Sequence, residues 1–257
     1  MSNSYPLQNL ANKKRIIYLF LRNKEGQLEI KEENSFFPFY YEPDIKGKYR
    51  GYDGTPLKRV FASEPADVVH MRSPNSYSAD IRFPVNFMIH RISSILPSPT
   101  KYCFLDIEIQ VSEIPDVRNA KYPISCISLY NSFSKNIQTF FLLDYASEKE
   151  MIEAFIKYMQ TERFDLWISW SDFDYTYCYS RIKDFAKRIS PINSARMGEN
   201  RDIFYPAGIS IIDFLKWFKK IYMREASYAL NYIGEKHLGR GKKYKDVDFS
   251  KVNETVK

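Results

Sequence analysis

The sequence predicts an α/β protein with two domains, residues 1–100 and residues 101–257. Apolar runs of strand length, separated by turn residues, fill roughly the first hundred positions. After them, apolar strands alternate with amphipathic helical segments. A proline-bearing stretch at 96–99 separates the two patterns, and a chain of 257 residues is long enough for two modest hydrophobic cores.

The first domain is expected to be a small α+β unit. Asn23 to Gly26 provides hairpin-turn residues between two apolar runs. Pro38 places its own apolar segment at a sheet edge or bend, because proline has no N–H for a ladder hydrogen bond. The expected elements are strands at 15–22, 27–31, 36–41 and 57–62, and a short helix that begins near Pro65 and ends at Arg72.

The second domain is expected to be a mixed sheet with helices on both faces, because three strands in succession are followed by alternating helices and strands. Ser147 and Glu150 have the spacing of a capping box and predict the start of its first helix. The expected strands are 102–111, 122–130, 137–143, 164–169 and 208–213, and the expected helices are 148–160, 174–188, a segment ending at 222, and 227–238.

The composition is that of a globular intracellular protein, with 44% hydrophobic and 27% charged residues. No apolar run approaches the roughly 18 residues of a membrane span, and the N-terminal residues lack the apolar core of a secretory signal. Three scattered cysteines exclude a disulfide scaffold. We therefore expect a cytoplasmic, nucleoid-associated or viral protein that is not secreted and has no membrane partner.

The charge and the aromatic content are compatible with nucleic-acid binding. The formal net charge is +7 and aromatic residues make up 16% of the chain. Lysine and arginine neutralise phosphates, and aromatic rings stack on bases. An AT-rich genome would raise the Lys, Tyr and Phe content equally well, so composition leaves both explanations open.

Three carboxylates predict a metal site. Asp106 and Glu108 lie two residues apart in an apolar strand, so both side chains project from the same face. Their mutual repulsion is relieved by a hard divalent cation such as Mg²⁺ or Mn²⁺, or by exposure to water at a sheet edge. Asp174 follows the strand at 164–169, where sites collect in sheets with crossover connections. Helix capping by Asp172 or Asp174 is the alternative.

Two motifs resemble those of a known family. Residues 104–108 (FLDIE) resemble the first exonuclease motif of the family B DNA polymerases. Residues 147–181 resemble the helix, strand and second exonuclease motif of that family. The family pattern F-D-x-x-Y-x-x-x-R falls on Phe173, Asp174, Tyr177 and Arg181.

The resemblance continues on both sides of these motifs and covers about the whole chain in the same order. The segments 38–41, 64–68 and 78–90 resemble parts of the family's N-terminal domain. The segment 224–243 resembles the helix that follows the second motif. The resemblance therefore implies an N-terminal domain in residues 1–100 and a ribonuclease-H-like 3′–5′ exonuclease domain in residues 101–257, incomplete at its C-terminus.

The resemblance also implies the roles of individual residues. Asp106, Glu108 and Asp174 would be the catalytic residues and would hold two Mg²⁺ or Mn²⁺ ions. By residue type alone, the rings of Tyr130, Trp170 and Tyr175 are candidates for stacking on terminal bases, and packing in the core or on the surface is the alternative for each. The nucleic-acid-binding residues would be Trp170, Ser171, Phe173, Tyr177 and Arg181.

The implied function is proofreading, the hydrolysis of single-stranded DNA ends during DNA replication. The implied partners are single-stranded DNA, primer-template DNA and the palm, fingers and thumb of a polymerase, either in cis or as a separate chain. The chain is then expected to be a fragment that does not polymerise alone. The alternative is a non-catalytic module that binds single-stranded template and docks the polymerase portion, with a degenerate exonuclease site.

The sequence departs from the family pattern at three places. The stretch from Trp170 to Asp174 is shorter than the family's second motif and has Ser171 where the family has Asn. Ile109 replaces a common Thr after the first motif. The family's third motif, Y-x-x-x-D, would supply a fourth carboxylate to the site. Only the segment from Tyr244 to Asp248 has its spacing, and this segment resembles the motif in nothing else.

Overall fold

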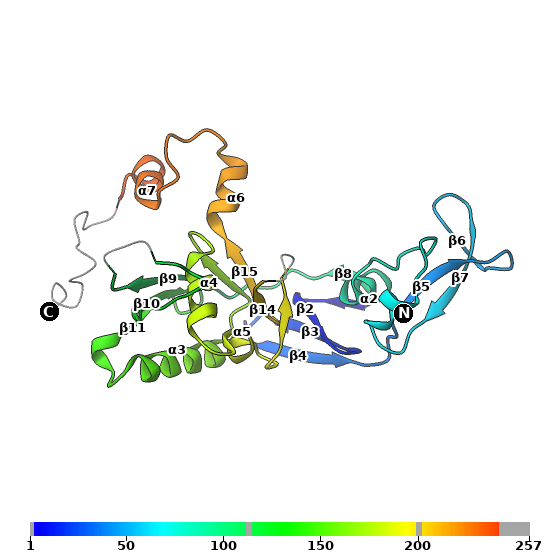
Figure 1. Cartoon of the computed structure of the whole chain (residues 1–257), viewed down its shortest axis with the longest axis horizontal. Helices are drawn as coiled ribbons and strands as arrows, with labels where there is room; N and C mark the ends of the chain where they lie inside the picture. Colours follow the sequence, from blue (N-terminus) through cyan, green and yellow to red (C-terminus); the bar gives the residue numbers. More distant parts are fainter. Residues whose placement is uncertain (1–2, 112–114, 199–201, 242–257) are drawn as a thin grey trace. The chain divides into compact units, whose positions relative to one another are not determined.

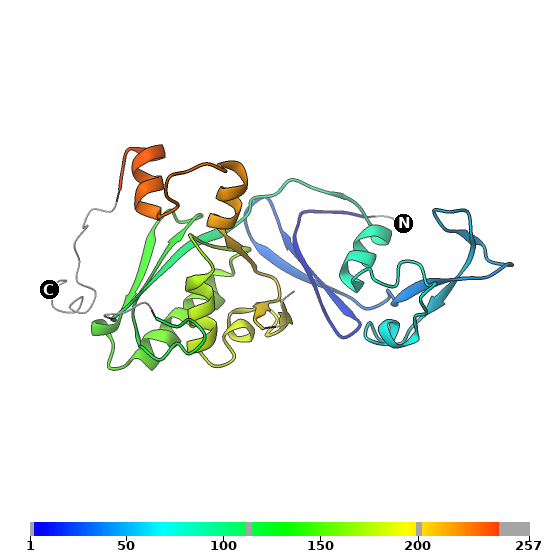
Figure 2. The same cartoon turned by 45° about the horizontal axis from the view of Figure 1, so that its top comes forward.

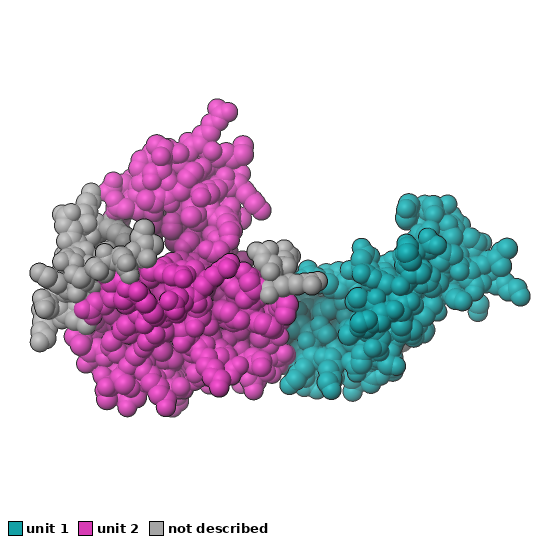
Figure 3. All heavy atoms as spheres, viewed as in Figure 1, with its two compact units in different colours: residues 1–100 teal, residues 101–257 magenta. Residues whose placement is uncertain are grey.

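The computed structural model describes residues 3–111, 115–198 and 202–241. The chain divides into two compact units, residues 1–100 and residues 101–257, coloured separately in Figure 3. Each unit has its own hydrophobic core and is described by itself.

The first unit contains two three-stranded antiparallel sheets. One has the order β2-β3-β4 and the other the order β5-β7-β6. A parallel pair, β1-β8, and two helices complete the unit. The elements are β1 (Asn3–Tyr5), β2 (Leu7–Lys13), β3 (Ile16–Arg22), β4 (Leu28–Glu33), β5 (Phe39–Pro43), β6 (Tyr49–Arg50), β7 (Pro56–Phe61), α1 (Asp67–Met71), α2 (Phe83–Arg91) and β8 (Ile92–Ile95).

The strands predicted at 15–22, 27–31, 36–41 and 57–62 are all present as β3, β4, β5 and β7. Pro38 immediately precedes β5, and β5 lies at the edge of its sheet as predicted. The core of the unit is formed by alternate residues of β3, by the phenylalanines around β5 and by α2: Ile17, Leu19, Leu21, Phe36, Phe39, Phe83 and Phe87.

The second unit is built on a five-stranded mixed sheet with the order β11-β10-β9-β12-β15. The pairs β9-β10 and β10-β11 are antiparallel, whereas β12 pairs in parallel with both β9 and β15. This is the mixed sheet that the succession of elements predicts. The strands are β9 (Tyr102–Ile109), β10 (Ile124–Asn131), β11 (Ile137–Phe141), β12 (Leu166–Ser169) and β15 (Ser210–Asp213).

Helices lie on both sides of this sheet. Figures 1 and 2 show α3 and α4 on one side and α6 and α7 on the other. The main core lies on the side of α3, α4 and α5. No helix in the described part of the chain is long and apolar enough to cross a membrane. The remaining elements are η1 (Leu142–Asp144), α3 (Glu148–Glu162), α4 (Phe173–Arg181), α5 (Phe185–Ile189), β13 (Ala195–Met197), β14 (Phe204–Pro206), α6 (Phe214–Ile221) and α7 (Leu230–Leu238).

The start of α3 follows the capping pattern with one difference. The Ser147 hydroxyl accepts a hydrogen bond from the Glu150 N–H at 3.3 Å, as expected of an N-cap. The Glu150 carboxylate accepts from the Ala146 N–H at 3.3 Å, one residue before the position of a capping box. The first bond satisfies an N–H group that the helix itself leaves without a partner.

The single helix predicted over 174–188 is wrong, because the structure contains two helices there. α4 ends at Arg181 and α5 begins at Phe185. Asp184, between them, has a φ of 56°, the left-handed conformation that Asp tolerates better than most residues. The break turns the chain so that Ile182 and Phe185 are both buried in the core.

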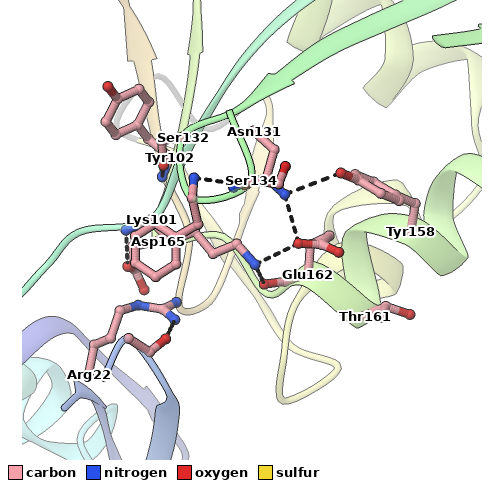
Figure 4. A network of polar contacts seen from close by, with 12 residues as sticks. Arg22, Lys101, Tyr102, Asn131, Ser132, Ser134, Tyr158, Thr161, Glu162 and Asp165 are labelled. Atoms are coloured by element: carbon pink, nitrogen blue, oxygen red, sulfur yellow. Dashed lines mark hydrogen bonds and ion pairs between the residues drawn. The ribbon is translucent and has the colours of Figure 1, made fainter. Parts of the chain in front are cut away.

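A polar network holds the start of β9 against the ends of its neighbours (Figure 4). The Lys101 N–H donates to the Asp165 carboxylate at 2.8 Å. The Lys101 ammonium donates to the carbonyl and to the carboxylate of Glu162, at 2.7 and 2.6 Å. The Asn131 amide donates to the same Glu162 carboxylate at 2.7 Å. The network ties the beginning of β9 to the end of α3, upstream of the two carboxylates on this strand.

Candidate carboxylate site

The alternation of β9 places two carboxylates on the face opposite its core side. Cys103, Leu105 and Ile107 are buried, whereas Asp106 is exposed and Glu108 is half-buried. In the antiparallel pair with β10, Asp106 lies opposite Ser128 and Glu108 lies opposite Cys126. The two acidic side chains therefore share one face, as the spacing predicts.

Asp174 reaches the same stretch of β9 from the helical layer. The last pairing between β12 and β9 joins Ile168 and Phe104, so β9 continues beyond the end of its partner. At that edge, the Ile107 N–H donates to Asp174 Oδ1 at 3.1 Å. Since Ile107 lies between the two acidic residues of β9, this hydrogen bond brings the third carboxylate to the same stretch of backbone.

The environment of Asp174 disfavours its charge. The side chain is buried in the first turn of α4, with 5% of its surface exposed. Burial raises its pKa to about 7, and the Asp106 carboxylate and, more weakly, that of Glu108 contribute to the rise. The hydrogen bond from Ile107 opposes the rise without cancelling it. The three carboxylates thus influence one another electrostatically.

Helix capping does not account for the two aspartates before and within α4. Asp172 occupies the N-cap position but makes no side-chain capping hydrogen bond. Its exposed carboxylate pairs with the Lys216 ammonium at 2.6 Å. Asp174 lies inside the helix and bonds to β9 instead. The capping alternative is therefore excluded for both residues, and only Asp174 lies with the β9 carboxylates.

The three carboxylates do not form a complete metal site. Among the residues that the structure describes, no three His, Cys, Asp or Glu side chains are arranged so that they could hold a metal ion together. The chemistry of the donors nevertheless fits Mg²⁺ or Mn²⁺, which prefer carboxylate oxygens. Burial is the main cause of the raised pKa of Asp174, and the nearby Asp106 carboxylate adds to it.

Three of the residues expected to contact nucleic acid lie beside Asp174. Trp170, Ser171 and Phe173 are half-buried at the connection from β12 to α4. The Trp170 ring packs against Phe214 and Phe218 of α6, with centroids 6.0 and 5.8 Å away. The Ser171 hydroxyl accepts from the Phe173 N–H at 3.4 Å. These side chains keep some accessible surface at the start of α4.

Tyr177 and Arg181, which are also expected to bind nucleic acid, both make contacts that support the fold. Tyr177 has 0% of its surface exposed, and its hydroxyl donates to the Tyr122 carbonyl at 2.7 Å. Arg181 donates to the Glu148 carboxylate and to the Ala120 and Lys121 carbonyls. A side chain without exposed surface cannot contact a strand, and the Arg181 guanidinium is already engaged by four hydrogen bonds.

Tyr175 is likewise not available for stacking on a base. It is 1% exposed, and its hydroxyl donates to the Phe204 carbonyl at 2.6 Å. Its ring stacks on Tyr205, with centroids 5.3 Å apart. Tyr130 is half-buried on β10 and keeps partial exposure.

The departures from the family pattern have different consequences. Ile109 is 6% exposed and belongs to the core, so its side chain lies away from the face of Asp106 and Glu108. The segment from Tyr244 to Asp248, which has the spacing of the third motif, lies outside the described residues. Sequence reasoning missed the Ile107 N–H as the group that positions Asp174, because a backbone donor leaves no signal in residue types.

The comparisons with known proteins agree with the resemblance. The family model "DNA polymerase family B, exonuclease domain" matches residues 63–233. The DNA-directed DNA polymerase of Escherichia phage RB69 is 27% identical over 202 residues, which cover 58% of this chain and 22% of the phage protein. The chain thus spans about a fifth of the length of that relative.

A solved structure matches almost the whole chain. The family B DNA polymerase from the hyperthermophilic archaeon Pyrobaculum calidifontis aligns with a TM-score of 0.73 and 16% identity, over 97% of this chain and 41% of that one. At this identity the match concerns the fold. Since the family model covers more than half of the residues, the chain belongs to DNA polymerase family B and carries the exonuclease domain of that family.

Proposed function

We propose that this chain is the N-terminal and exonuclease portion of a DNA polymerase, and that it hydrolyses single-stranded DNA from the 3′ end in proofreading. Residues 101–257 would form the ribonuclease-H-like exonuclease domain and residues 1–100 the N-terminal domain. Its partners would be primer-template DNA and the palm, fingers and thumb, in cis or as a separate chain. Membership of the family supports this proposal.

One observation carries the proposal. The hydrogen bond from Ile107 to Asp174 joins the first and second exonuclease-like motifs at the residue between Asp106 and Glu108. The bond thereby brings together two segments 67 positions apart, through the backbone of one and the carboxylate of the other. A merely structural aspartate would gain nothing from the proximity of like charges.

The three carboxylates are proposed to hold two Mg²⁺ or Mn²⁺ ions when DNA is bound. Such ions, when bound, acidify a water molecule and neutralise the charge that develops on the leaving 3′-oxygen. Asp106 and Glu108 would supply oxygens from the sheet face, and Asp174 would supply an oxygen from the helix. The Ile107 N–H would hold Asp174 in orientation, and the rings of Trp170 and Phe173 would lie against the terminal nucleotides.

The test is an exonuclease assay with the whole chain. A single-stranded oligonucleotide labelled at its 5′ end is incubated with Mg²⁺ or Mn²⁺, and shortening from the 3′ end is followed on a gel. Asp106→Asn and Asp174→Asn are each expected to lower the rate on the order of 100-fold. Asp184→Asn is the matched control, because Asp184 is exposed and has a positive φ that Asn tolerates. Unchanged hydrolysis by the double variant of Asp106 and Asp174 would refute the assignment.

A non-catalytic role is the second candidate, favoured by one finding. No three of the described acidic, His or Cys side chains form a metal-ready group. In that case the chain would bind single-stranded template and dock the polymerase portion with a degenerate site. Salt-dependent binding of single strands, without hydrolysis in Mg²⁺ or Mn²⁺ and also in the presence of the polymerase portion, would favour this alternative.

A further inference from the structure

The helix α6 packs with only part of its apolar surface. Its apolar residues Phe214, Trp217, Phe218 and Ile221 follow one another at spacings of three and four and share one side of the helix. Phe214 and Phe218 pack on Trp170, and Phe218 is buried. The other two, Trp217 and Ile221, keep 51% and 53% of their surface exposed. We call Trp217 and Ile221 the α6 edge.

Folding does not explain the exposed surface of the α6 edge. His237 of α7 covers Phe218, with ring centroids 5.5 Å apart, so α7 packs on the buried part of α6. The exposed half of Trp217 and of Ile221 contributes little to stability, since this surface stays in water. Met223, just beyond the helix, is 78% exposed. Large apolar side chains exposed in one short segment are typical of an interaction surface.

The charge beside the α6 edge has a single sign. Residues 214–224 contain four Lys and Arg residues and no Asp or Glu. Lys216 is compensated by the Asp172 and Asp213 carboxylates, at 2.6 and 3.1 Å. Lys220 and Arg224 are exposed, and neither forms an ion pair with a carboxylate in the described part of the chain. Because Lys220 lies one helical turn after Trp217, uncompensated positive charge adjoins the exposed apolar surface.

We propose that the α6 edge binds an acidic amphipathic helix of another protein. The apolar side chains of the partner cover Trp217 and Ile221, and its Asp and Glu side chains pair with Lys220 and Arg224. A helix fits this surface, because rows of side chains at spacings of three and four interlock when two helices pack. Tryptophan and arginine are also the residues that most often dominate the binding energy of protein interfaces.

The charge and the side-chain types select this partner over others. Four cations without a carboxylate favour an acidic partner and disfavour a second copy of the same surface. The branched aliphatic side chain of Ile221 offers no flat ring on which a base could stack, which favours protein over nucleic acid. The proposal goes beyond the proposed function and does not rest on it, since neither cleavage nor metal binding is involved.

A designed peptide tests the proposal on the whole chain. The probe is a synthetic, fluorescently labelled peptide of about three heptads, with Leu at the a and d positions and Glu at most others. A peptide with the same residues in scrambled order and a peptide with Lys in place of Glu are the reference probes. Fluorescence anisotropy in EDTA at low salt measures the three dissociation constants, and the acidic helical peptide is expected to bind most tightly.

The tryptophan emission gives a second measurement. Trp167 is fully buried, whereas Trp217 is half exposed, so covering the α6 edge is expected to shift the emission to shorter wavelength. Trp217→Phe should remove most of this shift while retaining binding, because phenylalanine keeps an apolar ring at this position.

Two pairs of variants separate the apolar and the charged contributions. Trp217→Ala is expected to weaken binding of the acidic peptide about 10- to 30-fold. Its control is Ile137→Ala, since Ile137 is 72% exposed on β11, at the opposite edge of the sheet from β15. Lys220→Glu should weaken binding of the acidic peptide and strengthen binding of the Lys peptide. Its control is Lys157→Glu, at an exposed position of α3 on the other side of the sheet (Figure 1).

The proposal is overturned if the acidic peptide binds no more tightly than the scrambled one, or if Trp217→Ala binds it as the original chain does. Binding of a labelled oligothymidylate that depends on Trp217, with peptide binding that does not, would overturn it in favour of nucleic acid. Dimers in sedimentation that Trp217→Ala abolishes, again without peptide binding, would overturn it in favour of a second copy. No part of the test measures hydrolysis, so its outcome is separate from that of the exonuclease assay.

Discussion

Arg181 and Glu148 form a two-point ion pair between α4 and the first turn of α3. Arg181 Nη2 lies 2.6 Å from Glu148 Oε2, and Arg181 Nε lies 3.0 Å from Glu148 Oε1. Glu148 Oε1 also accepts the N–H of Ile124, the first residue of β10. The pair therefore links two helices and a strand of the sheet.

We expect Arg181→Ala to lower the free energy of unfolding by about 2–4 kcal/mol, because Glu148 and two backbone carbonyls would lose a shared, largely buried donor. Urea unfolding followed by circular dichroism measures this change. Arg188→Ala is the matched control, since Arg188 pairs with Glu153, whose side chain is 52% exposed, and it should cost less than about 1 kcal/mol. Equal losses in the two variants would contradict the structural role of Arg181.

Asp174 should make the stability of the metal-free chain depend on pH. Its pKa is about 7 in the folded chain and 3.8 without the fold, so the folded state keeps a proton that the unfolded state releases between these values. The free energy of unfolding should therefore fall as pH rises from about 4 to 7. Asp174→Asn should remove this fall and stabilise the chain at pH 8 by about 4 kcal/mol. The free energies of unfolding of the variant and of the original chain are measured in EDTA at pH 4 and pH 8. The same change between the two pH values in both proteins would contradict the prediction.

Divalent cations should stabilise the chain at neutral pH. If Asp106, Glu108 and Asp174 hold Mg²⁺ or Mn²⁺, a cation concentration of 100 times the dissociation constant should add about 2.7 kcal/mol to the free energy of unfolding. The midpoint of thermal unfolding measures the effect, with a potassium salt at matched ionic strength as the control. The shift should be lost in Asp106→Asn. A shift that persists in this variant would mean that the ions bind elsewhere.

The cap of α3 should matter for stability but not for the site. Ser147→Ala removes the acceptor of the Glu150 N–H and should cost about 1 kcal/mol. Ser180→Ala, at an exposed position near the end of α4, is the control and should change stability by less than about 0.5 kcal/mol. Chemical denaturation measures the free energy of unfolding of the two variants. Similar losses of stability in both would argue against a stabilising role for the Ser147 cap.

Much of the second unit is predictable from sequence because its signals are local. The alternation along β9 places Asp106 and Glu108 on one face without reference to any other segment. The Ser147 cap and the apolar stripe of α3 identify that helix in the same way. The pattern of the second motif, which includes Phe173 and Asp174, led to the correct family.

Other elements were missed because their causes are not local. The break between α4 and α5 has neither Gly nor Pro to mark it, and it arises because Ile182 and Phe185 are both buried in the core. β2 was not predicted, since its burial is only partial and depends on pairing with β3.

The sequence by itself determined the family, the mixed sheet and the strand face of Asp106 and Glu108, because these depend on residue order and on the two-residue period of a strand. Only the tertiary structure decided that Tyr177 and Arg181 support the fold, and that Asp174 meets β9 at Ile107. Their partners lie 33 to 67 positions away along the chain, and a hydrogen bond over such a separation exists only once the sheet and its helices have packed.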